Sequence, residues 1–251
     1  TNNTNGCVAF DTVVVNQNIM APPTDAGLPD TITCSIIQVS LLANAPGALL
    51  FNWSSPNGLF NSSTNGAQVD VGAAGNYFLT VTDPANGCSS IDSVQIFENK
   101  VVPALSLTVP NTLTCTLMSQ NIQVQNQSAP GNFSYSWVAS NGGNIVSGNN
   151  SISPNINAPG NYMLTSINLA NGCKATLSAT VVQDIAAPNI QLIAPGQITC
   201  TNPSQSILAQ NQSLPGNFNY NWVASNGGNI VSGNTSLSPT VNMGGDYTLT
   251  T

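Results

Sequence analysis

The sequence predicts an all-β protein made of tandem β-sandwich domains in a linear array. A fixed series of marks (a cysteine, a tryptophan, a glycine followed by a tyrosine, and a second cysteine) recurs with a period of about 80 to 85 residues. Apolar and polar residues alternate along short runs, as they do in half-buried strands. Clusters of Gly, Pro and Asn separate these runs about every 8 to 12 residues, at the spacing of turns between strands.

The period divides the chain into segments that each begin near a proline. Residues 1–21 correspond to the last strand of a preceding repeat, because Asn5-Gly6-Cys7 and the apolar run after it align with Asn86-Gly87-Cys88 and its run. The three repeats that follow are 22–102, 103–187 and 188–251, the last of which lacks its final strand. The short mixed linkers between them are typical of domain boundaries.

Within a repeat, about seven short strands favour a sandwich of the immunoglobulin type. Each repeat has one tryptophan where that fold carries its core tryptophan on the third strand. Each also has a tyrosine two residues after a glycine, at the start of the sixth strand, where its hydroxyl can bond back to a corner. We expect these aromatics to pack in the core, and a surface stacking role is the alternative. The positions are Trp53, Trp137, Trp222, Tyr77, Tyr162 and Tyr247.

Composition excludes several kinds of partner. Charged residues make up 4% of the chain, and the formal net charge is −7 with a pI near 4.1. Only Lys100 and Lys174 are basic, so a nucleic-acid partner is excluded because phosphates would remain unneutralised. No run of 18 apolar residues occurs, so membrane insertion is not expected. The start at Thr1, without a leader, indicates a mature or interior piece of something longer.

Catalysis has little support, because the chain has no His, no Arg and a single Glu, and no acid–base pair recurs between repeats. No cofactor is expected. The one candidate ion is a structural calcium held by carboxylate oxygens. Its weak candidate ligands are Asp25, Asp30, Asp83 and Asp92. The corresponding positions of the other repeats are mostly uncharged.

The cysteines occupy two positions in each repeat, and the absence of His favours disulfides over metal sites. They are Cys7, Cys34, Cys88, Cys115, Cys173 and Cys200. Pairing within a repeat would join Cys34 to Cys88 and Cys115 to Cys173. The strand order places those partners at opposite ends of a sandwich, about 20 Å apart, whereas a disulfide needs Cα atoms within about 7 Å.

We therefore prefer pairing across junctions, with Cys34 bonded to Cys173, and keep pairing within repeats as the alternative. In this scheme Cys115 and Cys200 reach later repeats, and Cys7 and Cys88 are tied to earlier ones.

The first full repeat carries the series Asp25-Ala26-Gly27, Thr33-Cys34, Phe51-Asn52-Trp53, Gly75-Asn76-Tyr77-Phe78-Leu79-Thr80-Val81-Thr82-Asp83 and Asn86-Gly87-Cys88. This series resembles the PKD-like and SprB-type repeats of very large surface proteins of the Bacteroidota. The resemblance covers the whole chain, although the second and third repeats lack the Asp-Ala-Gly entry. It implies an adhesin or filament exported by the type IX route and, in some members, moved along the cell during gliding.

The same resemblance implies O-glycosylation at Asp followed by Ser or Thr and then an apolar residue. The matching acceptors are Thr12, Thr31 and Ser93. A glycan there would supply hydration that the sparse charges do not.

The leading functional hypothesis is a structural or adhesive segment of a large secreted cell-surface filament, with a gliding-motility adhesin as its finer form. Its partners would be adjacent repeats, neighbouring copies, and surface glycans or solid surfaces. One alternative is a pilin-like subunit that polymerises by strand donation, because the chain begins with a spare last strand and ends without one. Another is a carbohydrate-binding module that uses Asn-rich loops and an exposed tryptophan.

Overall fold

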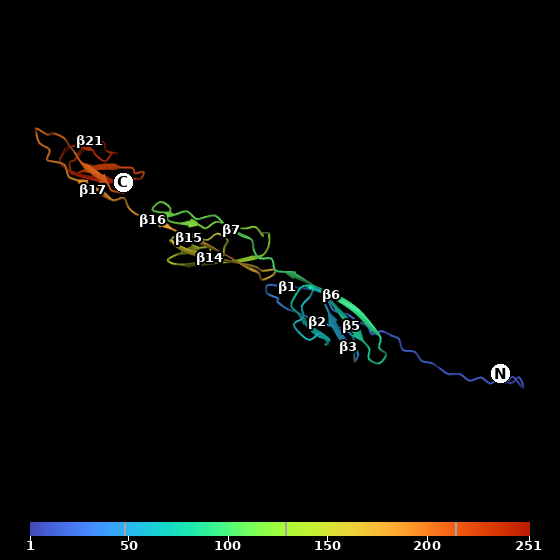
Figure 1. The fold of residues 1–251 in the computed structure, drawn as a ribbon. Coiled ribbons are helices and arrows are strands. Elements are labelled where there is room, and N and C mark those ends of the chain that lie inside the picture. Colours follow the sequence, from blue (N-terminus) through green and yellow to red (C-terminus); the bar gives the residue numbers. More distant parts are fainter. Residues whose placement is uncertain (48, 129, 214) are drawn as a thin grey trace. The chain divides into compact units, whose positions relative to one another are not determined.

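Every regular element in the described part of the chain is a β-strand (Figure 1). The structure is a computed structural model that describes residues 1–47, 49–128, 130–213 and 215–251. No helix there is long and apolar enough to cross a membrane. The chain divides into two units, Thr1–Gln183 and Asp184–Thr251, called unit one and unit two below. Unit one contains the first two repeats apart from residues 184–187, and unit two contains the third.

The first repeat is a sandwich of two sheets. One sheet has the strand order β1-β6-β5-β3, and β2 pairs with β4 in the other. The first and last strands run parallel, so that β1 extends beside the far end of β6. The strands are β1 Asp30–Thr33, β2 Val39–Leu42, β3 Leu50–Ser54, β4 Gln68–Val71, β5 Gly75–Thr82 and β6 Ser89–Asn99.

The second repeat has a similar strand arrangement, divided among more sheets with fewer strands in each. Its largest sheet has the order β11-β14-β15, and β8 pairs with β16, which follows β15 directly. Two further pieces, β12-β13-β9 and β10-β7, complete it. The strands are β7 Leu105–Leu107, β8 Leu113–Thr114, β9 Gln120–Asn121, β10 Val124–Asn126, β11 Phe133–Ser140, β12 Ile145–Ser147, β13 Asn155–Ile156, β14 Gly160–Asn168, β15 Lys174–Val181 and β16 Gln183–Asp184.

Unit two repeats this order up to the strand that carries the tyrosine. Its pairings are β17-β19, β18-β22-β21 and β20-β23. The strands are β17 Ile190–Ile193, β18 Gln205–Ser206, β19 Leu208–Asn211, β20 Asn221–Ser225, β21 Asn229–Ser232, β22 Thr240–Met243 and β23 Asp246–Thr250. The prediction of tandem immunoglobulin-like β-sandwich domains is therefore confirmed at the level of the fold.

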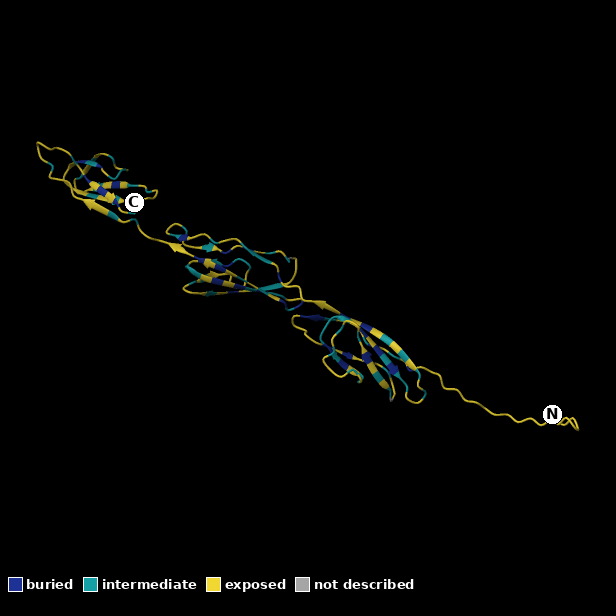
Figure 2. Ribbon diagram, in the orientation of Figure 1, coloured by how far each residue is buried: buried dark blue, intermediate teal, exposed yellow. Residues whose placement is uncertain are grey.

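Each repeat has a separate apolar core, made by the alternation read from the sequence. In β5, Tyr77, Leu79 and Val81 are buried and their neighbours are less so, and Figure 2 shows the same alternation along other strands. The tryptophans are also buried, at 2 to 5% exposure. Each indole N–H donates to a backbone carbonyl 13 or 14 residues later, which satisfies the one polar atom of the ring.

The tyrosines make the expected corner, and the geometry explains the glycines around them. The Tyr162 hydroxyl donates to Ala158 O at 2.6 Å and accepts from Asn144 N at 2.9 Å. A Cβ on Gly160 would lie 2.6 Å from the Cα of Gly143, so two chain segments meet where only glycines fit. The recurring Gly-Asn-Tyr and Asn-Gly-Gly-Asn motifs therefore form one packed corner.

The opening tail does not form the strand that its sequence resembles. No strand occurs between residues 1 and 29, and the side chains of Phe10, Val13 and Val15 are 83 to 91% exposed. The assignment of residues 1–21 to the last strand of a preceding repeat therefore stays a prediction. A strand needs a neighbour for its backbone hydrogen bonds, and residues 1–29 pair with none of the described strands.

Candidate functional site

A disulfide joins the first repeat to the second. Cys34 directly follows β1 and Cys173 directly precedes β15, and their Cα atoms are 5.0 Å apart. The two residues are separated by 139 positions. A closed loop of that length lowers the entropy of the unfolded chain, which stabilises the fold by about 5 kcal/mol in the chain-entropy model.

The register of the first repeat excludes the alternative pairing of Cys34 with Cys88. Thr33, at the end of β1, lies beside Asn99, at the end of β6. Cys88 precedes the other end of the same strand, which is about 35 Å away at 3.3 Å per residue. Pairing within the first repeat therefore fails because β1 and β6 run parallel, whereas pairing across the junction needs no movement of the strands.

Asn171 holds the same junction through hydrogen bonds. Its side-chain amide donates to Asn99 Oδ1 and to Val101 O, both at 2.9 Å, at the end of the first repeat. Its backbone carbonyl accepts from Cys34 N at 3.0 Å, and its Oδ1 accepts from Cys173 N at 3.0 Å. Asn171 is 1% exposed. A buried amide with these bonds satisfied fixes the linker in one conformation.

Gly172 brings the two repeats into contact. Its φ is +71°, a left-handed conformation that favours glycine. A Cβ at this position would lie 2.7 Å from the Cβ of Ser35, which follows Cys34. The Asn-Gly-Cys motif therefore supplies three things in consecutive residues. Asn171 holds the linker through its hydrogen bonds and is called the asparagine clamp below, Gly172 makes a left-handed turn that leaves room for Ser35, and Cys173 forms the disulfide.

The clamp recurs one repeat earlier. The Asn86 amide donates to Asn18 Oδ1 at 3.1 Å and to Met20 O at 3.0 Å, and its Oδ1 accepts from Cys88 N at 2.8 Å. These partners correspond to those of Asn171, but Asn86 is only half-buried. The sequence reasoning missed both asparagines. The available signal was the constant Asn two residues before each second cysteine, as in Asn5, Asn86 and Asn171.

The other four cysteines, Cys7, Cys88, Cys115 and Cys200, lie outside this disulfide. Cys88 is half-buried and the other three are exposed. Their proposed bonds to earlier or later repeats stay a prediction.

The aspartates suggested for calcium bond mainly to nearby backbone N–H groups. Asp92 accepts from Ala26 N at 2.7 Å, and Asp25, Asp30 and Asp83 each accept from a backbone N–H one or two residues later. No group of three acidic, Cys or His side chains suited to a metal gathers in the described ranges. The structure therefore does not bring the four candidates together, and a calcium role stays a prediction.

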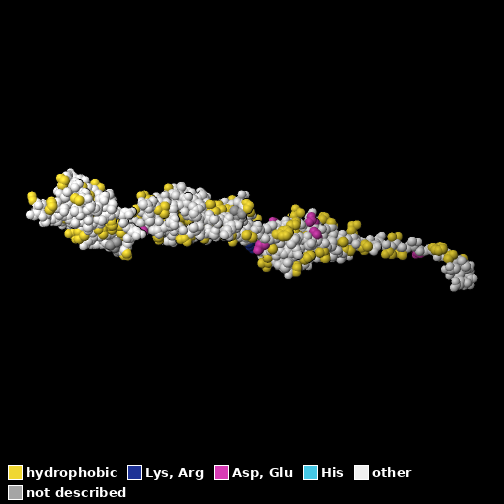
Figure 3. Space-filling view, turned by 90° about the horizontal axis from the view of Figure 1, so that it is seen from above, with side chains coloured by type: hydrophobic (Ala, Val, Ile, Leu, Met, Phe, Trp, Pro, Cys, Tyr) yellow, Lys and Arg dark blue, Asp and Glu magenta, His cyan; other side chains and the backbone are white. Residues whose placement is uncertain are grey.

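Charges are sparse on the face that Figure 3 shows, and the acidic side chains gather mainly over the first repeat. Lys100, in the linker after β6, pairs with Glu98 at 2.7 Å. Both side chains are almost half exposed, so this ion pair contributes little stability.

The three suggested glycan acceptors differ in access. Thr12 and Ser93 are exposed, whereas Thr31 is half-buried in β1. Ser93 points outward from β6, opposite Phe78. An attached sugar at Thr12 or Ser93 would extend into solvent without displacing the core.

No family model and no curated protein matches this chain. Among solved structures, the titin I-band fragment I67–I69 matches at 11% identity and a TM-score of 0.36, covering 90% of this chain and 89% of that one. Three N-terminal domains of the bacteriophage RB49 outer capsid protein Hoc match at 13% and 0.33, covering 82% of each chain. Drosophila OTK extracellular domains 3–5 match at 10% and 0.28, covering 97% and 96%. Identities and TM-scores this low say nothing about function.

Proposed function

We propose that this chain is a structural and adhesive segment of a secreted cell-surface filament, built from non-enzymatic domains. The observation that carries the proposal is the Cys34–Cys173 disulfide, which links successive repeats instead of closing one repeat. A bond across a junction transmits load from domain to domain. Structural disulfides also persist in oxidising surroundings outside the cytosol.

The finer assignment is a filament of the PKD-like and SprB-type class, exported by the type IX route and serving as a gliding adhesin. It is supported by the ordered series of motifs from Asp25 to Cys88. Glycans at Thr12, Thr31 and Ser93 belong to the same assignment. They would hydrate a surface that has few charges.

The structure does not support the carbohydrate-binding alternative, because its tryptophans are buried. It requires an exposed tryptophan, and Trp53, Trp137 and Trp222 are only 2 to 5% exposed. Each lies beneath its own sheet, with its indole nitrogen already bonded to a carbonyl.

A force measurement tests the load-bearing role. When the oxidised chain is pulled from its ends, residues 35–172 stay inside the covalent loop. Its full extension should be about 480 Å shorter than that of a Cys34→Ser/Cys173→Ser variant, at about 3.5 Å per residue. Cys88→Ser is the matched control and should not change the extension. Equal lengths for the oxidised chain and the double variant would contradict the proposal.

Localisation needs its own experiment. Antibodies against this chain, applied to intact producing cells and detected by immunogold, should label extended structures outside the cell envelope. Label found only after the cells are permeabilised would contradict a surface filament.

A further inference from the structure

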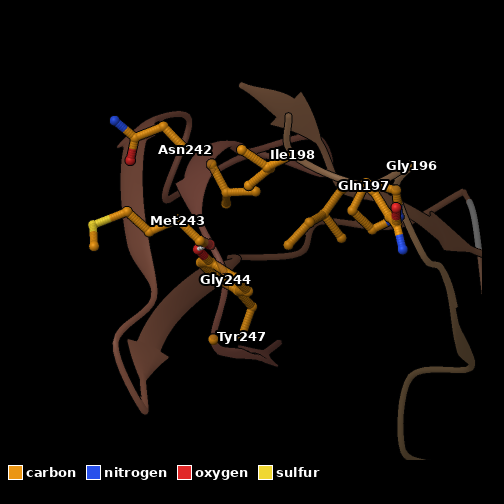
Figure 4. A pocket seen from close by; sticks show the side chains of 11 residues that line it. Gly196, Gln197, Ile198, Asn242, Met243, Gly244 and Tyr247 are labelled. Carbon is orange, nitrogen blue, oxygen red and sulfur yellow. Dashed lines mark hydrogen bonds between the residues drawn. The ribbon is translucent and has the colours of Figure 1, made fainter. Parts of the chain in front are cut away.

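Seven asparagines in this chain are directly followed by glycine. In such a pair the backbone nitrogen of the glycine can attack the side-chain amide of the asparagine, because glycine has no Cβ to crowd its nitrogen. A larger following residue hinders this attack, as Met243 does after Asn242 at the pocket of the third repeat (Figure 4). The seven pairs are Asn5-Gly6, Asn57-Gly58, Asn65-Gly66, Asn86-Gly87, Asn141-Gly142, Asn171-Gly172 and Asn226-Gly227.

The attack converts the asparagine to an acid and needs only water as a co-reactant. A bond forms between the glycine nitrogen and the side-chain Cγ, and the bond from Cγ to Nδ2 breaks. The proton of the glycine nitrogen leaves with Nδ2 as ammonia, and a succinimide ring remains. Water then opens that ring at either carbonyl, which gives aspartate or isoaspartate. The glycine nitrogen and both polar atoms of the amide must therefore be free to move.

In the pair Asn141-Gly142 these groups are free. The pair lies at the turn between β11 and β12, and both residues are exposed. Neither the Asn141 amide nor the Gly142 nitrogen donates to a partner within the described part of the chain. The φ of Asn141 is +51°, so its backbone belongs to a tight turn and not to a strand. This pair therefore sets the reference rate of the reaction in the folded protein.

In the pair Asn171-Gly172, at the asparagine clamp, the same groups are all held. The Gly172 nitrogen donates to Asn168 O at 2.7 Å. The Asn171 amide donates to Asn99 Oδ1 and Val101 O, and its own oxygen accepts from a backbone nitrogen at 3.0 Å. Because Asn171 is 1% exposed, water is excluded as well. The closed junction therefore blocks a reaction that the local sequence favours.

The product of the reaction does not fit the closed junction. An ionised aspartate has no hydrogen to donate, so Val101 O loses its donor and meets a negative charge instead. Burying that charge in a site as enclosed as that of Asn171 costs free energy. Isoaspartate also adds its Cβ to the backbone directly before Gly172, next to the disulfide at Cys173. A junction that has reacted therefore closes less tightly than before.

We propose that Asn171-Gly172 is a deamidation site that the closed junction between the first two repeats keeps unreactive. Opening of the junction releases the Gly172 nitrogen and the Asn171 amide, and the loss of ammonia then makes the opening permanent. The fraction of acid at position 171 thereby records how long the junction has been open. This inference goes beyond the proposed function, because it applies whether heat, denaturant or load opens the junction.

The test follows Asn141 and Asn171 in the same chain, so that the exposed pair is an internal clock. The folded, oxidised chain is incubated at neutral pH, and mass spectrometry of its peptides measures aspartate and isoaspartate at both sites. Asn171 should react at least about tenfold more slowly than Asn141, because its reaction needs a rarely populated open state. In urea the two rates should become similar, since no tertiary contact remains. Cys34→Ser/Cys173→Ser should accelerate the reaction at Asn171 and leave that at Asn141 unchanged.

A second arm measures the consequence of the reaction. Asn171→Asp carries the product from the start and should speed hydrogen exchange at residues 99–101. Asn141→Asp is the matched control and should leave that exchange unchanged, because Asn141 is exposed. Three results would overturn the inference: equal rates at Asn141 and Asn171 in the folded chain, no reaction at Asn171 in urea, or unchanged exchange in Asn171→Asp. None of them affects the proposed function, whose test is the extension of the chain under force.

Discussion

The second repeat and the corresponding sites at Asn86 and Tyr247 make the same local hydrogen bonds but differ in burial. Asn171 and Asn86 donate to corresponding partners, yet only Asn171 is fully buried. Tyr162 and Tyr247 make the same corner, yet only Tyr162 is buried. Local sequence thus sets the hydrogen bonds, and a neighbouring strand or domain sets the burial that makes them costly to break.

The largest expected difference concerns glycine at the two junctions. Gly172→Ala should lower the free energy of unfolding by about 3 kcal/mol, because the new methyl group meets Ser35 and the left-handed φ is strained. Gly87→Ala has the same strain with no atom within 4 Å, and should cost only about 1 kcal/mol. Denaturant unfolding of the oxidised chain checks both. Equal costs would mean that the contact with Ser35 adds nothing.

The asparagine clamp should give the next largest difference. Asn171→Ala removes a side chain that is 1% exposed and leaves the buried Cys173 N and the acceptors Val101 O and Asn99 Oδ1 without their partner, at a cost of about 2 to 3 kcal/mol. Asn86→Ala should cost under about 1 kcal/mol, because water replaces the lost bonds. Hydrogen exchange in residues 99–101 and 18–20 measures each effect locally. A larger effect at Asn86 would reverse the comparison.

The tyrosine corners should differ more modestly. Tyr162→Phe removes a buried hydroxyl that donates to Ala158 O and accepts from Asn144 N, and should cost about 2 kcal/mol. Tyr247→Phe removes the same bonds at a half-exposed site and should cost about 0.5 kcal/mol. Exchange rates in β14 and β23 report the two effects.

The smallest expected effect is an increase in the free energy of unfolding, whereas the variants above lower it. Ser166 is fully buried in β14, and its hydroxyl has no hydrogen-bond partner in the described structure. The first repeat has Val81 at the corresponding position, also fully buried. Ser166→Val should therefore stabilise the second repeat by about 1 kcal/mol, measured by denaturant unfolding, while Val81→Ser should destabilise the first. A destabilising Ser166→Val would point to a missed partner for the hydroxyl.

The sequence by itself determined the repeat, the all-β class and the core aromatics. Those features depend on contacts close in the chain: alternation along a strand, glycine at a turn, and a tyrosine that bonds four residues back, as Tyr77 does to Ala73 O. Such short-range constraints leave a periodic signature that one chain can show three times.

Only the tertiary structure decided which cysteine partner fits and how deeply Asn171 is buried. Cys34 and Cys173 meet across 139 positions because the parallel pairing of β1 with β6 carries Cys34 to the end of its domain, where the second repeat begins. Strand direction and domain stacking are long-range properties, since many distant contacts must form together. The tail shows the same limit: its alternation predicts a strand, whereas residues 1–29 form none in the structure, because a strand needs backbone partners that its own sequence does not supply.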